Sequence, residues 1–508
     1  MSHEITANNS FAAIDLGSNS FHMAVAGGRQ AHLQMIDKLR RPVRLGSGLD
    51  ANNVIQPETM ERALECLSLF QQRLRGVPRS HIRVVGTNTL RRARNADVFN
   101  AAAERILGVP IDIISGREEA RLIFAGVTYG TRDNKKRLVI DIGGSSTEII
   151  AGTGTKPKLM GSINAGCVVA TEHWFTSGEP LPKQFEKAVK QTQIELQPLT
   201  GKYIKHEWDH CIGSSGTIKA TEKILCALGI SDRGITAQGL QQLIKLLGKK
   251  GISALKNIDF IGEDRRSVII GGLSVLLATF RSLDIEFMGV SHAALREGVL
   301  VELGDDKPKE HVRMNAVIDL QQRFLVDVDQ ATRVSDTAEL LFNKVRKPWR
   351  LSRKHDLSTL LWACDLHEIG LSVSHVQYHK HGEYLLRNAD LLGFSRNDQM
   401  MLASLVRNHR RKVAIEFTGG LSASDQKRYP YLLVLLRLAI LLQRTRGVVS
   451  TPALELIVEK KSLTIELPAQ WLASHPLTGA DLRDEIAPLK ALGFQLTLLP
   501  QSEVELPD

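Results

Sequence analysis

Two stretches of the chain combine short apolar runs with turns of small polar residues. In the more pronounced one, residues 138–142 predict a buried strand, residues 143–146 a turn without bulky side chains, and residues 147–151 the returning strand. Such a turn leaves backbone N–H groups free for phosphate oxygens, and glycine allows a close approach. We therefore expect a phosphate-binding turn made of Gly143, Gly144, Ser145 and Ser146.

The same pattern occurs near the N-terminus, in residues 11–27. A shift of 126 positions (141 − 15) places Asp15 on Asp141 and Ser20 on Ser146, each time between two strand-like runs. Each aspartate stands at the mouth of its turn, where a carboxylate can hold a hydrated Mg²⁺. Two phosphate-facing hairpins predict a duplicated domain with a cleft between its halves.

A third glycine-rich turn, residues 213–217, follows a strand-like segment and precedes a helix predicted over 218–228. A turn at a helix N-terminus suits an anion or a nucleotide, although one such turn is a weak signal by itself. The residues from which we expect phosphate contacts here are Gly213, Ser215, Gly216 and Thr217.

Two charged side chains have both a structural and a functional interpretation. Arg91 follows the turn at residues 86–89, so it can bind phosphate or belong to a solvated basic face. Glu119 lies in the first turn of a helix predicted to start near residue 115. Its negative charge can stabilise the helix by interacting with the positive end of the helix dipole, or its carboxylate can act as a general base. The residues alone leave both alternatives open.

The pattern changes near residue 311, where strand signals end and helical periodicity continues to about residue 446. The polar stretch 304–309 is the best linker candidate, and the residues after 448 show the strands and helix of a small α+β domain. We therefore predict an α/β chain of four domains, residues 1–132, 133–306, 307–447 and 448–508.

The helical region is rich in histidine and arginine. His367, Glu368, His375 and His379 look like metal ligands, but their spacing is irregular, and a metal site is the less favoured interpretation. A basic cluster can form a track for a long anion, although a solvated basic face is the plain alternative. The residues of this predicted polyanion track are Arg407, His409, Arg410 and Arg411.

Composition narrows the partners and the compartment. The net charge of +10 suits a polyanion, whether nucleic acid, acidic lipid or a phosphate-rich molecule, and does not choose among them. The five cysteines lack CxxC spacing and predict free thiols in the cytoplasm. Residues 1–10 do not resemble a signal peptide, and the apolar runs 267–280 and 431–442 are too short to span a bilayer, so we expect core helices and no membrane insertion beyond peripheral association.

Six motifs in fixed order carry a family resemblance: AAIDLGSNSFHM, GTNTLRRARN, ISGREEARLIF, VIDIGGSSTE, IGSSGTIKA and ALREGVL. Together they resemble the exopolyphosphatase / guanosine pentaphosphate phosphohydrolase family, which belongs to the actin-like phosphotransferase superfamily. The resemblance implies two actin-like (ribonuclease H-like) domains with a cleft, an all-α HD-like domain and a small α+β C-terminal domain. It also implies a homodimer that does not bind nucleic acid.

The family pattern carries over to matching positions only. Glu119 matches the proposed catalytic glutamate, Arg91 a phosphate-binding arginine, and Glu148 a metal or water contact. The cofactor implied is Mg²⁺ near Asp15 and Asp141, with a monovalent cation such as K⁺ as a further candidate. The phosphate loops correspond to Asp15, Gly17, Ser18, Asn19 and Ser20 in the first hairpin, and Asp141 with residues 143–146 in the second. Ser145 departs from the three consecutive glycines of many relatives, and Glu368 departs from the His-Asp pair of true HD hydrolases.

The resemblance favours hydrolysis of the terminal phosphate of inorganic polyphosphate, and the alternative is the 5′-phosphate of pppGpp. Guanine would then lie along residues 212–219. A sugar or acetate kinase shares the superfamily fold, and a polyanion sensor without activity would share the cleft. The retained acids Asp15, Glu119 and Asp141 speak against the sensor.

Overall fold

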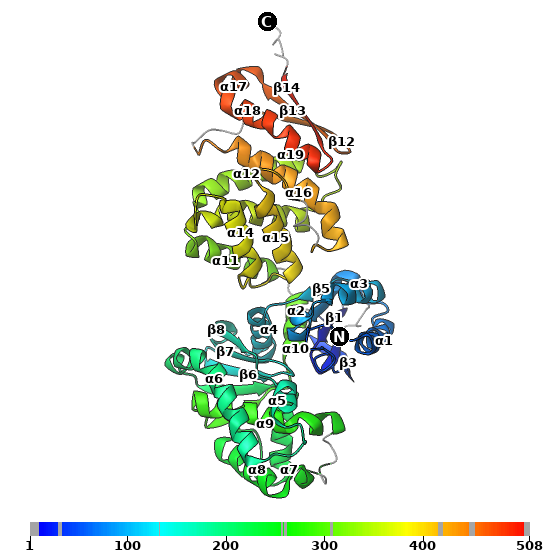
Figure 1. Ribbon diagram of the computed structural model, residues 1–508, viewed down its shortest axis with the longest axis vertical. Helices are drawn as coiled ribbons and strands as arrows, with labels where there is room; N and C mark the ends of the chain where they lie inside the picture. Colours follow the sequence, from blue (N-terminus) through cyan, green and yellow to red (C-terminus); the bar gives the residue numbers. More distant parts are fainter. Residues whose placement is uncertain are drawn as a thin grey trace, which may run out of the picture. The chain divides into compact units, whose positions relative to one another are not determined.

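The computed structural model describes residues 10–28, 33–131, 133–255, 258, 262–304, 308–414, 420–446 and 453–501. The chain forms two compact units, residues 1–309 and 310–508, and each is described by itself below (Figure 1). Most of the polar N-terminal stretch and the middle of the predicted linker, residues 305–307, lie outside the described residues.

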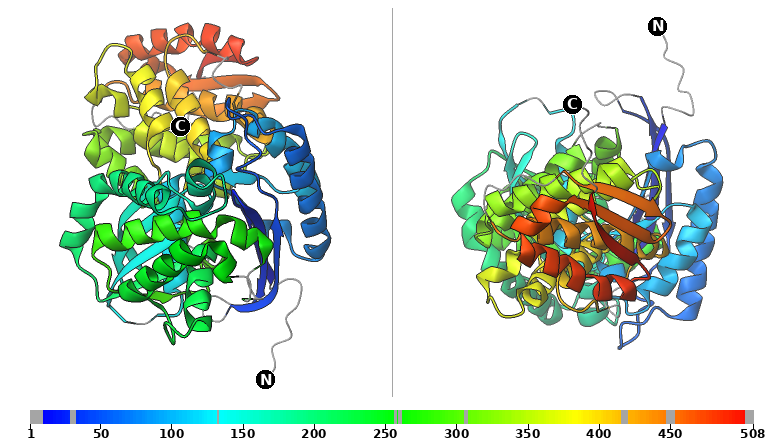
Figure 2. Two further views of the ribbon diagram at one scale, coloured as in Figure 1. Left: turned by 60° about the horizontal axis from the view of Figure 1, so that its bottom comes forward. Right: turned by 90° about the horizontal axis from the view of Figure 1, so that it is seen from above.

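The first unit holds two sheets. The first sheet has the strand order β3-β2-β1-β4-β5, with β1 antiparallel to β2 and parallel to β4. Helices α1 and α3 cover one of its faces, and the blue part of Figure 2 shows them side by side against the sheet. The bounds are β1 Ser10–Leu16, β2 Ser20–Gly27, β3 Gln34–Pro42, β4 Ile82–Gly86 and β5 Ile111–Ile113.

The second sheet, read from β8 as β8-β7-β6-β9-β11-β10, repeats this arrangement. In the first hairpin Leu16 pairs with Phe21, and in the second Ile142 pairs with Thr147, so both hairpins close at the same 126-residue offset. The predicted duplication is therefore confirmed in strand order and in register. The bounds are β6 Lys136–Ile142, β7 Thr147–Thr153, β8 Lys156–Ile163, β9 His210–Ser214, β10 Ile235–Thr236 and β11 Phe287–Val290.

Two helices lie between the sheets, and each packs against the sheet of the other half of the unit. Helix α4 comes from the first half of the unit but packs against β7 and β8, whereas α10 ends the second half and packs against β1 and β2. The helices cross where Gly126 faces Gly298, because a methyl group on Gly298 would lie 1.8 Å from the backbone oxygen of Leu122. The crossing therefore requires glycine and joins the two sheets through one apolar cluster.

The remaining helices of the first unit cover the outer faces of the two sheets or form the connections between strands. Their bounds, with those of α4 and α10, are α1 Pro57–Arg73, α2 Asn88–Arg92, α3 Ala96–Leu107, α4 Gly116–Thr128, α5 Cys167–Trp174, α6 Pro182–His206, α7 Ser215–Ala227, α8 Ala237–Lys250, α9 Glu263–Leu283 and α10 Leu295–Leu303.

The second unit is helical and ends in a small three-stranded sheet, β12-β13-β14. A single hydrophobic cluster runs from the helices into this sheet, for example from Leu436 to Leu463. The predicted order of two actin-like lobes, a helical region and a small α+β end is confirmed. The bounds are α11 Pro308–Arg323, α12 Val328–Val345, α13 Ser358–Leu366, α14 Tyr378–Asn388, α15 Arg396–Asn408, α16 Ala423–Leu442, β12 Glu455–Glu459, β13 Ser462–Pro468, α17 Ala469–Ser474, α18 Pro476–Asp484, α19 Ile486–Ala491 and β14 Gln495–Gln501.

One local prediction differs from the structure. Helix α7 begins at Ser215 rather than residue 218, so the third glycine turn is the junction between β9 and α7. Strand β8 and helix α5 follow the second hairpin, and the sequence did not single them out; β8 is an edge strand whose burial alternates only weakly, so its periodicity is hard to read. The helical part of the C-terminal region includes two short helices, α18 and α19.

Helix α9 is longer than its apolar run predicts. Its 21 residues make it, by length and composition, the one described helix able to cross a membrane, but 78% of its most apolar window is buried inside the unit. It packs against α5 and α6. The prediction of a core helix is confirmed, and only its expected length was wrong.

The helix crossing gives a stability prediction. Gly298→Ala inserts a methyl group against backbone that cannot rotate away, so we expect a loss of about 1–3 kcal/mol or more in the free energy of unfolding. Gly248→Ala, in helix α8 with nothing within 4 Å of the new methyl group, is the matched control and should be neutral or stabilising by up to about 1 kcal/mol. Urea unfolding of both variants measures this, and equal effects would contradict the packing described.

Candidate functional site

The two hairpin loops of the first unit touch each other. A methyl group on Gly144 would lie 3.2 Å from Cβ of Ser18 and 3.3 Å from the backbone nitrogen of Asn19. Gly46 fits between the loops, since a methyl group added at this position would lie 3.3 Å from Cβ of Ser18 and 3.4 Å from Oγ of Ser145. Small residues in both loops are therefore a condition for their approach.

Neighbouring segments hold each loop in place. In the first loop, the Thr89 hydroxyl donates a hydrogen bond to Oγ of Ser18 at 2.7 Å. The Gly46 nitrogen donates one to the backbone carbonyl of Ser18 at 2.8 Å. In the second, the Gly143 nitrogen donates to the carbonyl of Ser146 at 2.9 Å, and the carbonyl of Gly143 accepts from the nitrogen of Cys167. The loops are thus preorganised before any ligand binds.

The loops form the floor of a cleft of about 370 Å³ between the two lobes. Most of the predicted site residues line it, and they come from both hairpins, from α4 and from the start of α7. They are Asp15, Ser18, Asn19, Ser20, Glu119, Asp141, Gly143, Gly144, Ser145, Ser146, Ser215 and Gly216.

The other predicted residues lie behind the cleft surface. Gly213 lies within strand β9, Thr217 is 1% exposed, and neither lines the cleft, so the predicted contact of these two with a ligand needs correction: both support the wall. Glu148 is opposite Asp141 in the β6–β7 pair and accepts a hydrogen bond from Ser162 at 2.8 Å. It too is buried.

Ser215 stands out at the start of α7. Its φ of +83° is in the left-handed region, which a residue other than glycine rarely adopts. Its hydroxyl oxygen is buried and has no hydrogen-bond partner within the described residues. A strained, unpartnered hydroxyl that lines a cleft is typical of a ligand contact.

Glu119 is in the first turn of α4, whose N-cap Ser115 accepts a hydrogen bond from the backbone of Glu118. Nη1 of Arg91 donates to Oε2 of Glu119 at 2.9 Å and to the carbonyl of Ile114 at 2.8 Å. Burial raises the pKa of Glu119, and the charge of Arg91 opposes that shift. Arg91 therefore orients a carboxylate that keeps more basicity than an exposed glutamate.

Four carboxyl groups gather around the loops, and the pKa of each is raised. Burial raises the pKa of Asp15 to about 7, with Arg296 opposing and Glu119 and Asp141 adding to the shift. Burial also raises the pKa of Asp141, although the Ser214 hydroxyl donates a hydrogen bond to it. For Glu148, burial and then the charges of Glu119 and Asp141 place the pKa well above the ordinary value. Such a set of acids favours a cation nearby.

The acids fit a hydrated cation better than an enclosed one. Within the ranges that the structure describes, no three His, Cys, Asp or Glu side chains lie close enough to hold a metal ion between them. Asp15 and Asp141 line the cleft, and their mutual repulsion would be relieved by a divalent ion that retains several waters. Magnesium is bound in this way in many phosphate sites.

Four cations also line the cleft and form its basic wall, and the sequence did not single them out. Its cations come from four separate elements, so no local motif connects them. Gly216 leaves room for one of them, because a methyl group there would lie 1.9 Å from the guanidinium of Arg265. The residues are Arg40, Lys219, Arg265 and Arg296.

His22 also lines the cleft and was missed. Burial lowers the pKa of His22 well below its usual range, and Arg296 and Arg40 lower it further, so the ring is neutral. Its Nδ1 lies 3.1 Å from Nη1 of Arg296 and accepts that hydrogen bond. The register of the β1–β2 hairpin pairs His22 with Asp15, and the predicted hairpin is the sequence signal that could have pointed to it.

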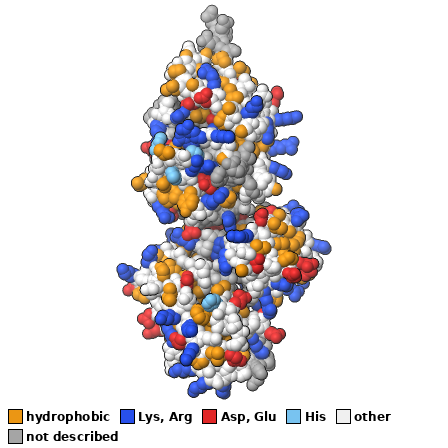
Figure 3. Space-filling view, viewed as in Figure 1, with side chains coloured by type: hydrophobic (Ala, Val, Ile, Leu, Met, Phe, Trp, Pro, Cys, Tyr) orange, Lys and Arg blue, Asp and Glu red, His pale blue; other side chains and the backbone are white. Residues whose placement is uncertain are grey.

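The second unit has a basic cavity of about 680 Å³ that includes Arg407, Arg410 and Arg411. Lys, Arg and His side chains gather on the face of this unit that Figure 3 shows. The guanidinium of Arg410 lies over the ring of Tyr378, 4.6 Å from its centre.

His409 corrects the predicted polyanion track. It is 2% exposed, its Nδ1 contacts the carbonyl of Val406 at 2.6 Å, and burial lowers its pKa well below the usual range, so it adds no charge to the surface. Arg437, from the same basic region of the sequence, is buried and paired with Glu485. Burial of His409 was not visible in the sequence because it stands between polar residues, Asn408 and Arg410.

The pKa of Asp15 gives a prediction about stability. The pKa is higher in the folded chain than the ordinary 3.8, so proton binding stabilises the fold. That stabilisation is complete below about pH 4 and is lost as the pH rises through 7. Between pH 5 and pH 8, without divalent cations, the wild type should lose at least about 1 kcal/mol relative to Asp15→Asn in urea unfolding. The same pH dependence in both proteins would contradict this assignment.

Comparison with known proteins gives the same fold for the first unit. An exopolyphosphatase-like protein of known structure is 26% identical, with a TM-score of 0.52, over 58% of this chain and 98% of its own. An exopolyphosphatase from Cytophaga hutchinsonii is 23% identical, with a TM-score of 0.53, over 58% and 98%. The Aquifex aeolicus PPX-GPPA enzyme is 25% identical, with a TM-score of 0.50, over 58% and 99%.

Family models extend the match to most of the chain. The model of the Ppx/GppA phosphatase family matches residues 24–306. The model of domain III of the Ppx/GppA phosphatases matches residues 312–486. The chain therefore belongs to the Ppx/GppA phosphatase family.

Proposed function

We propose that this phosphatase removes the terminal phosphate of inorganic polyphosphate and releases orthophosphate and a chain one unit shorter. The observation that carries the proposal is the cleft in which two small-residue loops, the carboxylate of Glu119 and a wall of four cations converge. Phosphoryl transfer needs positioning and charge stabilisation more than covalent chemistry, so this set of groups is sufficient.

The terminal phosphoryl group would lie between the two loops. Backbone N–H groups, the side chain of Asn19 and the hydroxyl of Ser146 are the donors available there. Asp15 and Asp141 would hold Mg²⁺ through waters, and the ion would neutralise charge on the phosphate oxygens. Donors fixed in advance stabilise the transition state without reorganisation.

Glu119 would activate the attacking water. Its raised pKa makes it a better proton acceptor than an exposed carboxylate, and Arg91 holds it in one orientation. The water attacks the terminal phosphorus opposite the bridging oxygen, the P–O bond to the chain breaks, and the proton passes to Glu119. The products are orthophosphate and the shortened chain.

Substrate choice follows from the basic wall. Arg40, Lys219, Arg265 and Arg296 would carry the phosphates that follow the terminal one, which suits a chain with one negative charge or more per phosphate. The second candidate is pppGpp. Ser215 and Gly216 line the same cleft beside Arg265, where a guanine ring and its ribose would lie. Parallel rates on the two substrates distinguish them.

A kinase is the rival from another class. It would transfer the phosphoryl group of ATP to an acceptor, whereas we expect orthophosphate release without any acceptor. Incubation with ATP and candidate sugars separates the two.

The free thiols of all five cysteines, four of them buried, support the cytoplasm as the compartment of this activity.

Replacement of Glu119 tests the mechanism. Glu119→Gln keeps the size of the side chain and its contact distance to Arg91 but removes the proton acceptor. We expect phosphate release to fall at least about 100-fold, while binding of polyphosphate, measured by calorimetry, changes less than about threefold. Near-normal turnover would show that another group activates the water.

The basic cavity of the second unit is our candidate for the polyanion track, formed by Arg407, Arg410 and Arg411. Arg410→Ala with Arg411→Ala should weaken binding of long chains about tenfold and of short chains little, because only long chains reach a second site. Lys249→Ala with Lys250→Ala removes the same charge from the exposed end of α8 and is the control. An equal effect on long and short chains would remove the track.

A further inference from the structure

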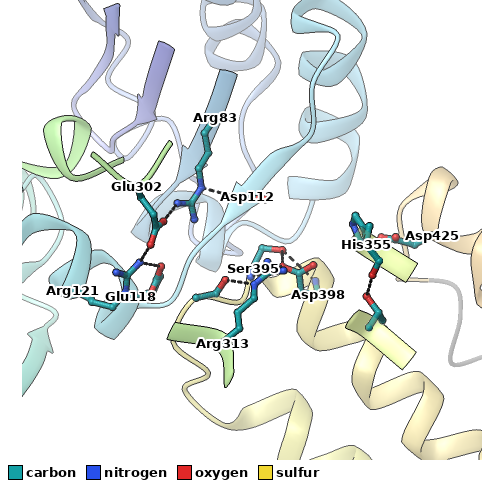
Figure 4. Close-up of polar contacts among 12 residues, drawn as sticks. Arg83, Asp112, Glu118, Arg121, Glu302, Arg313, His355, Ser395, Asp398 and Asp425 are labelled. Atoms are coloured by element: carbon teal, nitrogen blue, oxygen red, sulfur yellow. Dashed lines mark hydrogen bonds and ion pairs between the residues drawn. The ribbon is translucent and has the colours of Figure 1, made fainter. Parts of the chain in front are cut away.

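A chain of alternating charges lies behind Glu119, on the side of α4 that faces away from the cleft. Figure 4 shows it running from strand β5 through β4 and α10 to α4. Its residues are Asp112, Arg83, Glu302, Arg121 and Glu118.

Each link is a direct hydrogen bond. Nε of Arg83 donates to Oδ2 of Asp112 at 3.0 Å, and its Nη1 donates to Oε2 of Glu302. Nη2 of Arg121 donates to the other oxygen of Glu302, and its Nε and Nη2 bind both oxygens of Glu118 at 2.8 Å. The bidentate pair fixes the orientation of the guanidinium as well as its distance.

The centre of the network is buried. Glu118 is 0% exposed, and Arg83 and Glu302 are each 8% exposed. Burial alone would lower the pKa of Arg121, but the charges of Glu118 and Glu302 outweigh it and raise that pKa above its usual range. A buried ionic network of this kind contributes little net stability compared with apolar packing of the same volume, so stability does not account for it.

The network connects the elements that carry Glu119 and its partner. Glu118 immediately precedes Glu119 in the first turn of α4; Glu119 lines the cleft, whereas Glu118 is bound by Arg121 and does not line it. Arg83 lies in β4, which leads into the short helix α2 that bears Arg91. Glu302 lies on α10, which crosses α4 at Gly126 and Gly298. Both members of the Glu119–Arg91 pair thus extend from elements that the network holds together.

We propose that Arg83, Arg121 and Glu302, with Glu118, are positioning residues that hold Glu119 at the distance from Arg91 and from the two loops that water activation needs. This inference rests on the proposed role of Glu119. None of the network residues lines the cleft, so we infer that the network acts on Glu119 through the elements that carry it, α4 with β4 and α10. Displacement of a reacting group by about 1 Å can cost about 100-fold in rate, which sets the scale of the effect.

Glu302→Gln is the test, because it removes the shared charge and keeps the shape. We expect kcat for polyphosphate to fall at least about tenfold with KM within about twofold, and the acidic limb of the pH–rate profile to shift. Arg121→Lys keeps the charge but not the bidentate pair, and it should give a smaller loss of kcat. Arg121→Lys also provides the test of the positioning role if Glu302→Gln does not fold.

Asp133→Asn is the matched control. Asp133 binds the buried Arg137 through both oxygens, at 2.6 and 2.8 Å, in the same unit but beyond the C-terminal end of α4, whereas Glu119 is in its first turn. It should leave kcat unchanged. A loss of kcat in Glu302→Gln no larger than in this control would overturn the positioning role.

A second readout separates this inference from the proposed function. Crystal structures of the wild type and of Glu302→Gln should show the 2.9 Å contact between Arg91 and Glu119 displaced in the variant. If the wild type released no phosphate from either substrate, the proposed function would fail, and the structures alone would decide: an unmoved Glu119 would overturn the network's role.

Discussion

The close approach of the two hairpin loops is the constraint on which the rest of the first unit depends. Gly144 lies against Ser18, and even a methyl group there would press on Ser18 and Asn19 of the other loop. Because the two hairpins are copies in the same register, their aspartates and their N–H groups meet at one point between the lobes. The glycine crossing of α4 and α10 holds the sheets at the spacing that this meeting requires.

Charge is distributed unevenly around that point. Acids lie in and behind the cleft, where burial raises the pKa of Asp15, Asp141, Glu148 and Glu119, and four cations line the same cleft, with Arg296 close enough to oppose the rise in the pKa of Asp15. A polyanion end with its own cation would satisfy both sets of charges at once, whereas either set alone is electrostatically costly. The arrangement thus favours a ligand that brings positive charge to the acids and negative charge to the cations.

The sequence predicted the parts of the site that are local. Each loop, its flanking strands and its aspartate form one continuous segment, so the repeat at 126 residues was sufficient to find them. Glu119 was ambiguous, since a first-turn glutamate is common; the structure adds that it lines the cleft and binds Arg91, and its role as general base stays a prediction. The basic wall could not be predicted because Arg40, Lys219, Arg265 and Arg296 meet only after folding. The prediction for His409 was wrong because its polar neighbours in the sequence suggested a surface position, whereas the residue is buried.

The central claim is that one phosphoryl group lies between the two loops. A crystal structure with a triphosphate analogue whose bridging oxygens are replaced by methylene groups tests it most directly, because the analogue cannot be hydrolysed. We predict its terminal phosphorus between residues 17–20 and 143–146, with Glu119 facing the side opposite the bridge. A terminal phosphorus bound outside the loops, or a Glu119 carboxylate turned away from it, would contradict the account.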